Sequence, residues 1–231
     1  KIIDTKNTSS ILSIYTDYWE WIAIIYLSVP YSEKDEAKKL GSRWDPDKKK
    51  WYISETRDYS KVIKWIHGNI IIKNQIFIVE GNQTCWKCGK ATNVYAIGAL
   101  SEDVIDIHDE ESTSLKIETG FDLQIWPIEK HISTRLTNDL KQKYGCKVKY
   151  SFTEKRSYLA SVCSTCDSLQ GNFFLFNEPE SPFGWMNDSE LTLFKYSLKF
   201  DLVTCLDVNH QICPSYSYLD RSKILDTRKS V

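Results

Sequence analysis

The chain has 231 residues, of which 42% are hydrophobic and 26% are charged, values that are typical of a globular protein and exclude a largely disordered one. Its 30 Lys and Arg residues are balanced by 31 Asp and Glu residues, so the formal net charge is −1. Proteins that coat nucleic acid through their overall field are usually strongly basic, so any contact with nucleic acid must come from a local patch.

Compartment and membrane association can be judged from the apolar runs and the cysteines. The longest apolar run, residues 21–29, is too short to cross a bilayer, and no signal-peptide pattern is visible. Four of the seven cysteines form two C-x-x-C pairs, which favours metal binding in a reducing compartment over a disulfide framework. We therefore expect a cytoplasmic protein with no membrane partner.

The first predicted elements are a strand and a short helix. Residues 22–29 are rich in Ile, Val and Tyr and predict a strand that Pro30 ends. A helix is expected to begin after Ser32, whose hydroxyl could cap it, and to end before Gly41. The acidic residues that follow Ser32 suit the positive end of the helix dipole.

A hairpin and a second helix complete this part of the chain. Residues 42–45 and 50–53 predict two strands, because Pro46-Asp47-Lys48 between them is a typical turn sequence. Residues 58–66 place apolar side chains at helical spacing. The sequence therefore predicts a β-α-β-β-α unit over residues 24–67.

Strand patterns dominate the next part of the chain. Residues 69–80, 93–100 and 147–152 predict strands, and residues 132–144 predict a helix ended by Gly145. Near the end, residues 172–176 read as a short apolar strand and residues 189–199 carry helix signals.

The two C-x-x-C pairs predict a structural metal site. Cys85 and Cys88 form one pair, and Cys163 and Cys166 form the other. Two such pairs supply four thiolates, the ligand set of a tetrahedral structural Zn²⁺ site with no open position for water. The alternative is a pair of unrelated redox or free thiol motifs, although no thioredoxin-like pattern surrounds either pair.

The predicted fold is α+β. We expect a small N-terminal β-α-β-β-α unit packed on a split zinc-ribbon lobe that carries an inserted subdomain. The domains would be residues 1–80 and 81–231, with the insertion at residues 89–162 followed by a C-terminal extension. Cys205, His210 and Cys213 could hold a second metal, but their spacing is irregular and a fourth ligand is not evident.

Residues 27–53 read LSVPYSEKDEAKKLGSRWDPDKKKWYI. This segment resembles the bacterial DUF5710 family, with Gly-x-Arg-Trp-Asp and Lys-x-Trp-Tyr at the family's spacing and Ser42 where Ala is usual. It is similar, more weakly, to the HARP domain of annealing helicases. The resemblance implies nucleic-acid transactions, because such domains accompany primase-like, topoisomerase-like and antirestriction modules on plasmids and phages. It assigns no catalytic residue.

The hairpin combines basic and aromatic side chains, which together can hold phosphates and stack bases. The candidate nucleic-acid or partner-binding residues are Arg43, Trp44, Lys48, Lys49, Lys50 and Trp51. The alternative is that the two tryptophans pack the small core and the lysines only solvate the turn.

An acidic stretch offers a second candidate surface. The residues that could face a basic partner are Glu102, Asp103, Asp106, Asp109, Glu110 and Glu111. Asp106, His108 and Asp109 could also bind a divalent cation, but their spacing matches no calcium loop, so a solvated loop is favoured.

No catalytic constellation is found: the sequence has no P-loop, dinucleotide fingerprint, H-E-x-x-H helix or nucleophile elbow. We therefore expect a non-enzymatic, zinc-stabilised binding protein. Its leading function is a nucleic-acid-associated accessory factor of a mobile element or a bacterial defence locus. The alternatives are an immunity or inhibitor protein that blocks a toxin or other enzyme, and, more weakly, a metal-dependent nucleic-acid enzyme.

Overall fold

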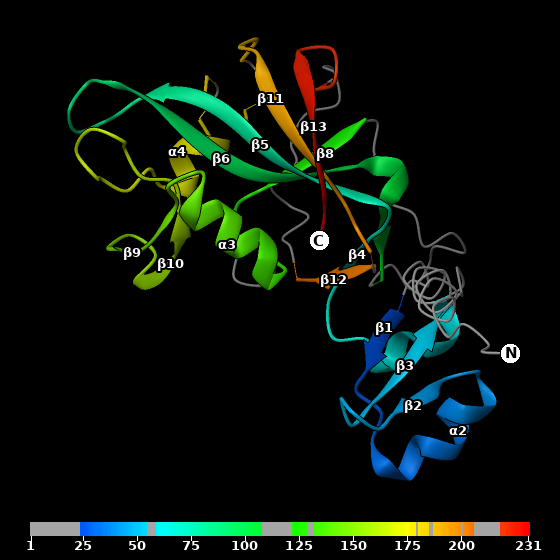
Figure 1. Cartoon of the computed structure of the whole chain (residues 1–231). Coiled ribbons are helices and arrows are strands. Elements are labelled where there is room, and N and C mark those ends of the chain that lie inside the picture. Colours follow the sequence, from blue (N-terminus) through cyan, green and yellow to red (C-terminus); the bar gives the residue numbers. More distant parts are fainter. Residues whose placement is uncertain are drawn as a thin grey trace, which may run out of the picture. The chain divides into compact units, whose positions relative to one another are not determined.

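Figure 1 shows the fold, taken from a computed structural model, in which two units can be recognised. The structure describes residues 24–54, 59–107, 122–128, 132–178, 180–184, 187–199, 201–205 and 218–231. Unit 1 is Lys1–Ile66 with Lys199–Asp201, and unit 2 is His67–Leu198 with Leu202–Val231.

Unit 1 contains the predicted helix and hairpin. In chain order its elements are β1 (Ile24–Leu27), a 3-10 turn (Tyr31–Glu33), α2 (Lys34–Lys39), β2 (Arg43–Asp45), β3 (Lys50–Ser54) and a 3-10 helix (Ser60–Trp65). Helix α2 has Glu33 at its N-cap, one residue after the predicted cap, and no side-chain cap bond. Gly41 ends it with φ of +92°, a conformation that glycine adopts without steric cost.

One sheet with the order β1-β3-β2, antiparallel throughout, supports this unit. Side chains alternate between its faces, so the cross-strand pair Ile25 and Ile53 is buried on one face. Ala37 of α2 and Val62 and Trp65 of the second helix are buried with them. The core of unit 1 is therefore a single layer of side chains between the sheet and two short helices.

Unit 2 is built mainly from strands. Its strands are β4 (Ile70–Ile72), β5 (Gln75–Thr84), β6 (Ala91–Leu100), β7 (Val104–Asp106), β8 (Leu123–Trp126), β9 (Lys147–Ser151), β10 (Arg156–Ala160), β11 (Leu191–Ser197), β12 (Leu202–Thr204) and β13 (Ser222–Ser230). Its helices are a 3-10 turn (Ser101–Asp103), α3 (Thr134–Gln142) and α4 (Asn172–Phe176). The α+β class is confirmed as strands in several sheets with few helices.

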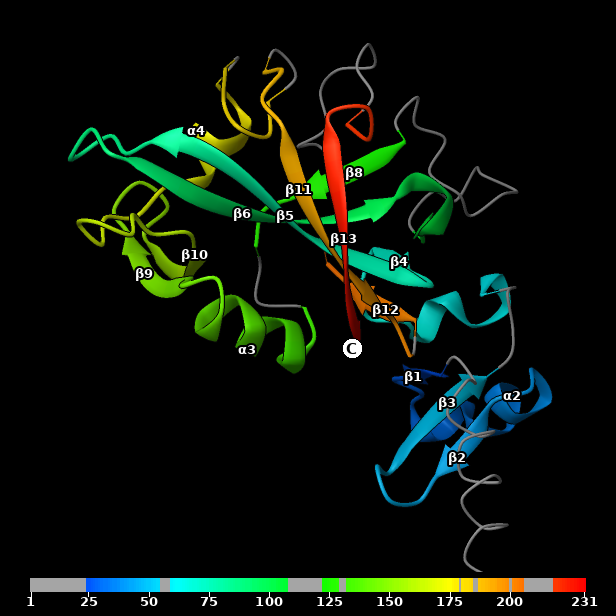
Figure 2. The same ribbon diagram turned by 45° about the horizontal axis from the view of Figure 1, so that its top comes forward.

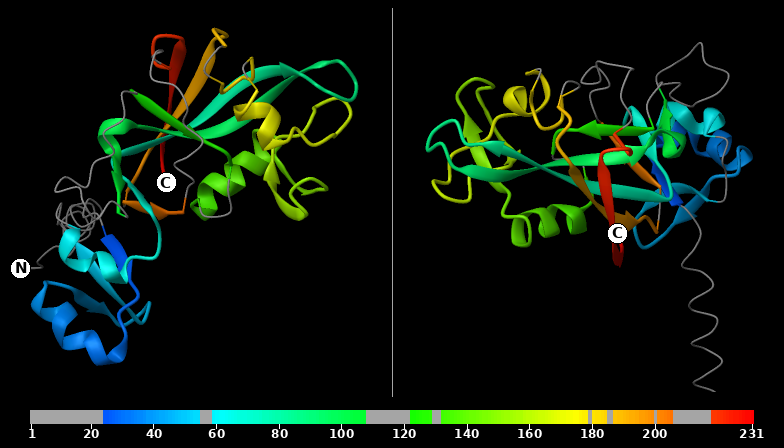
Figure 3. Two further views of the ribbon diagram at one scale, coloured as in Figure 1. Left: turned by 180° about the vertical axis from the view of Figure 1, so that it is seen from behind. Right: turned by 90° about the horizontal axis from the view of Figure 1, so that it is seen from above.

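A five-stranded sheet with the order β13-β11-β5-β6-β8 forms the centre of unit 2. Only β11 and β13 run parallel among its neighbours. On β5, Ile76 and Ile78 join the core cluster under α3, whereas Phe77 and Val79 join the cluster that contains α4. Figures 1 and 3 show these two helices on opposite faces. Because both faces are covered there, β5 is apolar and buried at every position from Ile76 to Val79.

Two smaller sheets flank this centre. Strands β12, β4 and β7 form an antiparallel three-stranded sheet. Strands β9 and β10 form a separate two-stranded hairpin, which lies near the far end of β5 and β6 (Figure 2). Helix α3 leads into that hairpin and is capped by Ser133, whose hydroxyl accepts a hydrogen bond of 3.2 Å from the Leu136 N–H.

Three predicted elements are different in the structure. Residues 172–176 form helix α4 and not a strand: Leu175 and Phe176 are buried while Phe173 and Phe174 are exposed, a helical pattern. Residues 191–197 form strand β11 and not a helix, since buried and partly exposed side chains alternate from Leu191. The second helix of unit 1 is a 3-10 helix shorter than residues 58–66.

No helix of the described residues is both long enough and apolar enough to span a bilayer.

The position of β11 can be tested by trimming its two faces. Leu193 is fully buried, whereas the neighbouring Thr192 is partly exposed. We expect Leu193→Ala to lower the free energy of unfolding by about 2–5 kcal/mol, because it leaves a cavity in the core. Thr192→Ala should change it by less than about 1 kcal/mol. Urea unfolding followed by circular dichroism measures both, and equal losses would contradict the strand register.

Candidate functional site

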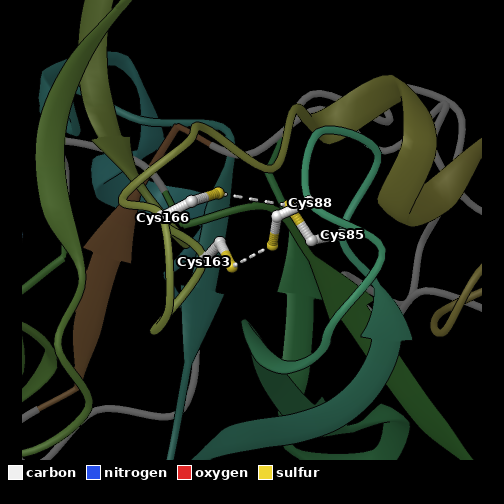
Figure 4. Close-up of side chains that lie close together, drawn as sticks. All are labelled: Cys85, Cys88, Cys163 and Cys166. Carbon is white, nitrogen blue, oxygen red and sulfur yellow. Dashed lines mark hydrogen bonds between the residues drawn. The ribbon is translucent and has the colours of Figure 1, made fainter.

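The four paired cysteines meet in unit 2. The Sγ atoms of Cys85, Cys88, Cys163 and Cys166 all lie within 4.8 Å of one another (Figure 4). They come from two loops far apart in sequence: one is the turn between β5 and β6, and the other follows β10. The sheet therefore brings together the two pairs that the sequence predicts as one site.

The first loop is a tight knuckle around Cys85. The Cys85 N–H donates to the Lys90 carbonyl at 2.8 Å, and the Gly89 N–H donates back to the Cys85 carbonyl at 2.9 Å. Gly89 has φ of +68°, which turns the chain back towards β6.

The second loop repeats the same local structure around Cys163. The Cys163 N–H donates to the Ser168 carbonyl at 2.9 Å, and the Asp167 N–H donates to the Cys163 carbonyl at 2.9 Å. Asp167 occupies the position that glycine has in the first knuckle and also has a positive φ, 57°. Two copies of one turn thus present their thiols to each other.

Contacts outside the thiols hold the two knuckles together. The indole N–H of Trp86, on the first knuckle, donates to the Leu169 carbonyl beside the second at 2.8 Å. The Ser164 N–H, on the second knuckle, donates to the hydroxyl of buried Thr92 on β6 at 3.2 Å. The sequence reading missed these residues, since a lone Trp or Thr beside a C-x-x-C pair carries no recognisable signal.

The sulfur–sulfur distances fit a shared ion better than disulfides. The Sγ atoms of Cys85 and Cys166 are 3.7 Å apart, and those of Cys88 and Cys163 are 3.6 Å apart. A disulfide requires about 2.05 Å. Four sulfurs at about 2.3 Å from a tetrahedral ion would be separated by about 3.8 Å. All six described cysteines are free thiols, so this cluster could bind a metal.

The protein environment changes the acidity of these thiols. Burial raises the pKa of Cys85, but N–H groups of Cys88 and Lys87 and the facing thiols outweigh it and lower that pKa to about 6. Backbone N–H groups of Cys166 and Thr165 likewise lower the pKa of Cys163. A metal binds the thiolate, so N–H groups that stabilise sulfur charge favour coordination.

Two glutamine side chains lie beside the cluster, and one of them contacts a cysteine sulfur. Gln170 is fully buried, and its side-chain amide donates to the Cys85 sulfur at 3.5 Å and to the Ser168 carbonyl at 2.9 Å. The Gln83 amide donates to the Gln170 side-chain oxygen at 2.8 Å and fixes its orientation. Such outer contacts orient metal ligands.

Two lysines neutralise the carboxylate of the second knuckle. Lys147 and Lys149 of β9 both pair with Asp167, the former at 2.8 Å. Hydrogen bonds from Lys147 and then Lys149 lower the pKa of Asp167 to about 2. The ion pairs tie the β9–β10 hairpin to the second knuckle.

The predicted hairpin cluster of unit 1 is divided between two faces of its sheet. Trp44 pairs with Trp51 across the hairpin, with ring centroids 5.7 Å apart, on the face that carries the core. Arg43 and Lys50 point to the opposite face, because side chains alternate along each strand. Trp44 is 49% exposed because it lies on the edge strand β2.

Tyrosines accompany Arg43 on the outer face of this sheet. Arg43 pairs across the strands with Tyr52, and Tyr52 pairs with Tyr26. The Tyr26 hydroxyl donates to Asp45 at 2.7 Å, and this hydrogen bond is the main reason that its pKa is raised to about 12. Asp45 also accepts from the N–H groups of Asp47 and Lys48, which shapes the turn that carries the lysines.

The acidic stretch is only partly described. Asp103 is buried and accepts hydrogen bonds from the side chains of Asn74, at 2.5 Å, and Gln75, at 3.3 Å, so it supports the fold and does not face a partner. Glu102 is exposed and Asp106 is half-buried on β7. Three predicted residues lie outside the described residues: Asp109, Glu110 and Glu111.

The two other cysteines among the described residues do not join the cluster. Cys146 is buried in the core under α3, where burial raises its pKa to about 12. Cys205 is exposed, and its two proposed co-ligands, His210 and Cys213, lie outside the described residues, as does His108.

The metal-binding capacity of the cluster can be tested by comparing two cysteine variants. We expect about one ion per wild-type chain and loss of that ion, with a lower melting temperature, in Cys163→Ser, because metal binding to such a site contributes folding free energy. Cys205→Ser is the matched control, since Cys205 is exposed and outside the cluster. Mass spectrometry of metals and thermal unfolding provide the measurements. Metal-free wild-type protein that melts like Cys163→Ser would contradict the site.

Comparisons with known proteins concern unit 1. Residues 25–67 match the family model described as "Domain of unknown function (DUF5710)", which confirms the resemblance predicted from residues 27–53. Two Escherichia coli proteins named "DNA primase TraC" are similar. One is 49% identical over 43 residues, which cover 19% of this chain and 3% of that protein, and the other is 48% identical over 40 residues, which cover 17% and 4%. No solved structure matches.

Proposed function

We propose that the chain is a nucleic-acid-associated accessory protein whose second unit is stabilised by a structural zinc ion, and that its role is binding. The observation that carries this proposal is the outer face of the unit 1 hairpin. There Arg43 and Lys50 accompany Tyr26 and Tyr52, and Lys48 and Lys49 extend from the adjoining turn. Cationic groups beside aromatic rings bind phosphates and bases together.

The ligand set favours zinc as the ion. Four cysteine thiolates at tetrahedral spacing suit soft, borderline metals, and Zn²⁺ in a Cys₄ site is closed to solvent and structural. Cys85 and Cys163 are almost fully buried, which agrees with a site that holds the fold together and not with one that admits substrate. When bound, the ion would join the two knuckles.

The electrostatics of the hairpin support attraction of an anion. Asp45 and Asp47 are the nearest carboxylates in sequence, and Asp45 is engaged by the Tyr26 hydroxyl and by two backbone N–H groups of the turn. Hydrogen bonds from Lys48 N–H and then Tyr26 lower the pKa of Asp45. Its charge is thus held within the turn, while Lys48, Lys49 and Lys50 stay exposed.

The similarity of residues 25–67 to a segment of proteins named DNA primase supports the same direction. The chain spans only 3–4% of the length of these relatives, so their enzymatic activity is not transferred here. What the similarity supports is a small domain that works alongside nucleic-acid enzymes.

The proposal is tested by fluorescence anisotropy with labelled DNA and RNA at low and near-physiological salt. We expect micromolar binding by the wild type and an approximately tenfold higher Kd for Arg43→Ala/Lys50→Ala, because each cation lost from a phosphate contact removes a charge-assisted hydrogen bond. The slope of log K against log salt should fall by about one for each phosphate contact removed.

The matched control is Lys38→Ala/Lys39→Ala, which removes the same charge from α2 in the same unit. It should bind like the wild type apart from a small loss of long-range attraction. Equal weakening in both double variants would show that only net charge matters and would contradict the hairpin surface. A Lys48→Ala/Lys49→Ala variant then tests whether the turn belongs to that surface.

A further inference from the structure

Unit 2 has a groove beside the cysteine cluster that no sequence motif indicated. A cavity of about 580 Å³ is lined by both knuckles, the β9–β10 turn and the start of α4. Its apolar lining includes Trp86, Tyr150, Phe152, Phe173 and Phe174.

The exposure of these rings is unusual for a folded chain. Phe152 is 87% exposed and Trp86 is 66% exposed, and the other three are each more than half exposed. Single exposed apolar residues are ordinary, but a contiguous group of five large rings around one groove marks a binding surface.

The rings are held in position by neighbours and not by burial. Tyr150 and Phe152 form an edge-to-face pair with centroids 5.2 Å apart, and Phe173 and Phe174 form another at 5.5 Å. Trp86 is fixed by the hydrogen bond from its indole N–H to the Leu169 carbonyl. In an edge-to-face pair one ring turns its edge to the other, which leaves ring faces available to a flat ligand.

The charge around the groove is positive. The charged residues that line it are Lys87, Lys149, Glu154 and Asp167, and three further bases adjoin the lining: Arg156 and Lys147, which pair with its carboxylates, and Lys155, which follows Glu154 in the chain. Both carboxylates are paired, Glu154 with Arg156 at 2.7 Å and Asp167 with two lysines. No carboxylate of the described residues pairs with Lys87 or Lys155, and both are exposed. Four thiolates around a divalent ion would carry a net charge of −2, so part of this excess offsets the cluster.

The geometry points to single-stranded nucleic acid as the occupant of this groove, an inference that rests on the proposed function and assigns it a second surface. Exposed aromatic faces stack bases, and the surrounding lysines can reach the phosphates. A duplex is a poorer ligand, because its bases are already stacked on one another. An apolar peptide would use the rings but would leave the lysine excess without a counterpart.

The knuckles supply part of the groove directly. Trp86 and Lys87 lie between the ligands of the first pair, and residues 166–169 of the second knuckle form another wall. The aromatic platform and the cysteine cluster are therefore one local structure, and the bound ion would set the distance between walls.

The experiment compares Phe152→Ala/Phe173→Ala with the wild type, using fluorescein-labelled twelve-nucleotide oligo-dT, oligo-U and a twelve-base-pair duplex. Both residues are exposed, so the variant should fold normally, which circular dichroism checks. We expect an approximately tenfold or larger rise in Kd for the single strands, because base stacking on each ring is lost, and a much smaller change for the duplex. The two single strands show whether DNA or RNA is preferred.

Ile224→Ala/Leu225→Ala is the matched control, since it trims two exposed apolar residues of β13 in the same unit. An equal rise in Kd for this control would overturn the groove as the binding site. Unchanged single-strand affinity in Phe152→Ala/Phe173→Ala would also overturn the groove as a binding site. If Arg43→Ala/Lys50→Ala weakened binding in the same experiment, the proposed function would remain intact. Wild-type protein that binds none of the three probes overturns both. If sedimentation instead shows self-association that this aromatic variant abolishes without affecting probe binding, the groove is an interface between copies of the chain.

Discussion

The convergence of four thiols from two distant knuckles is the constraint on which the far end of unit 2 depends. It brings the two ends of residues 89–162 together, and an ion held by all four thiols would join these ends in the folded chain. The β9–β10 hairpin inside this loop has only two strands and exposes Val148, Tyr150 and Phe152. Isolated two-stranded hairpins are marginal in water, so this one relies on the burial of Tyr158, Leu159 and Ala160 of β10 and on the ion pairs of Lys147 and Lys149 with Asp167.

The five-stranded sheet has a different source of stability. Its central strands bury side chains on both faces, with α3 over one and α4 over the other. Gly98 of β6 shows how tight that packing is: a Cβ atom there would lie 2.8 Å from a methyl group of Val79. The sheet thus forms a rigid support at whose end the first knuckle is the turn between β5 and β6. A rigid support of this kind lets a shallow surface loop keep a defined shape.

The sequence predicts those features that are determined by a few neighbouring residues, and fails for those that depend on contacts between distant parts of the chain. The cysteine pairs were predictable because two thiols separated by two residues can face one ion, and the hairpin of unit 1 because Pro46-Asp47-Lys48 specifies a turn. Residues 172–176 and 189–199 were misassigned because aromatic and β-branched residues suit both states, and tertiary contacts decided between them. Trp44 and Trp51 lie on one face of the sheet and Arg43 and Lys50 on the other. This arrangement follows from the strand register, which the spacing of the residues does not reveal.

The groove was invisible in the sequence for a related reason. Its rings come from three segments, around residues 86, 150–152 and 173–174, and only the first of these carries a motif, the C-x-x-C pair, which predicts a metal site and not a groove. Aromatic residues in a chain are ordinarily assigned to the core, and only the structure shows that Phe152 and its neighbours remain at the surface. Whether an apolar residue is exposed depends on the fold, so the groove could not be predicted from residue types alone.

The near-neutral charge of the chain limits how strongly the hairpin surface of unit 1 and the groove of unit 2 can attract an anionic partner. With a net charge of −1 there is little long-range attraction for a polyanion, and each surface has only a few cations to place against phosphates. In the function we propose, counterion release would contribute modestly, and most of the binding free energy would come from short-range stacking on aromatic rings. Stacking requires unpaired bases. Nucleic acid that another process has already opened into single strands would therefore be the best ligand for the surfaces we propose, and such a preference would suit an accessory role better than an independent one.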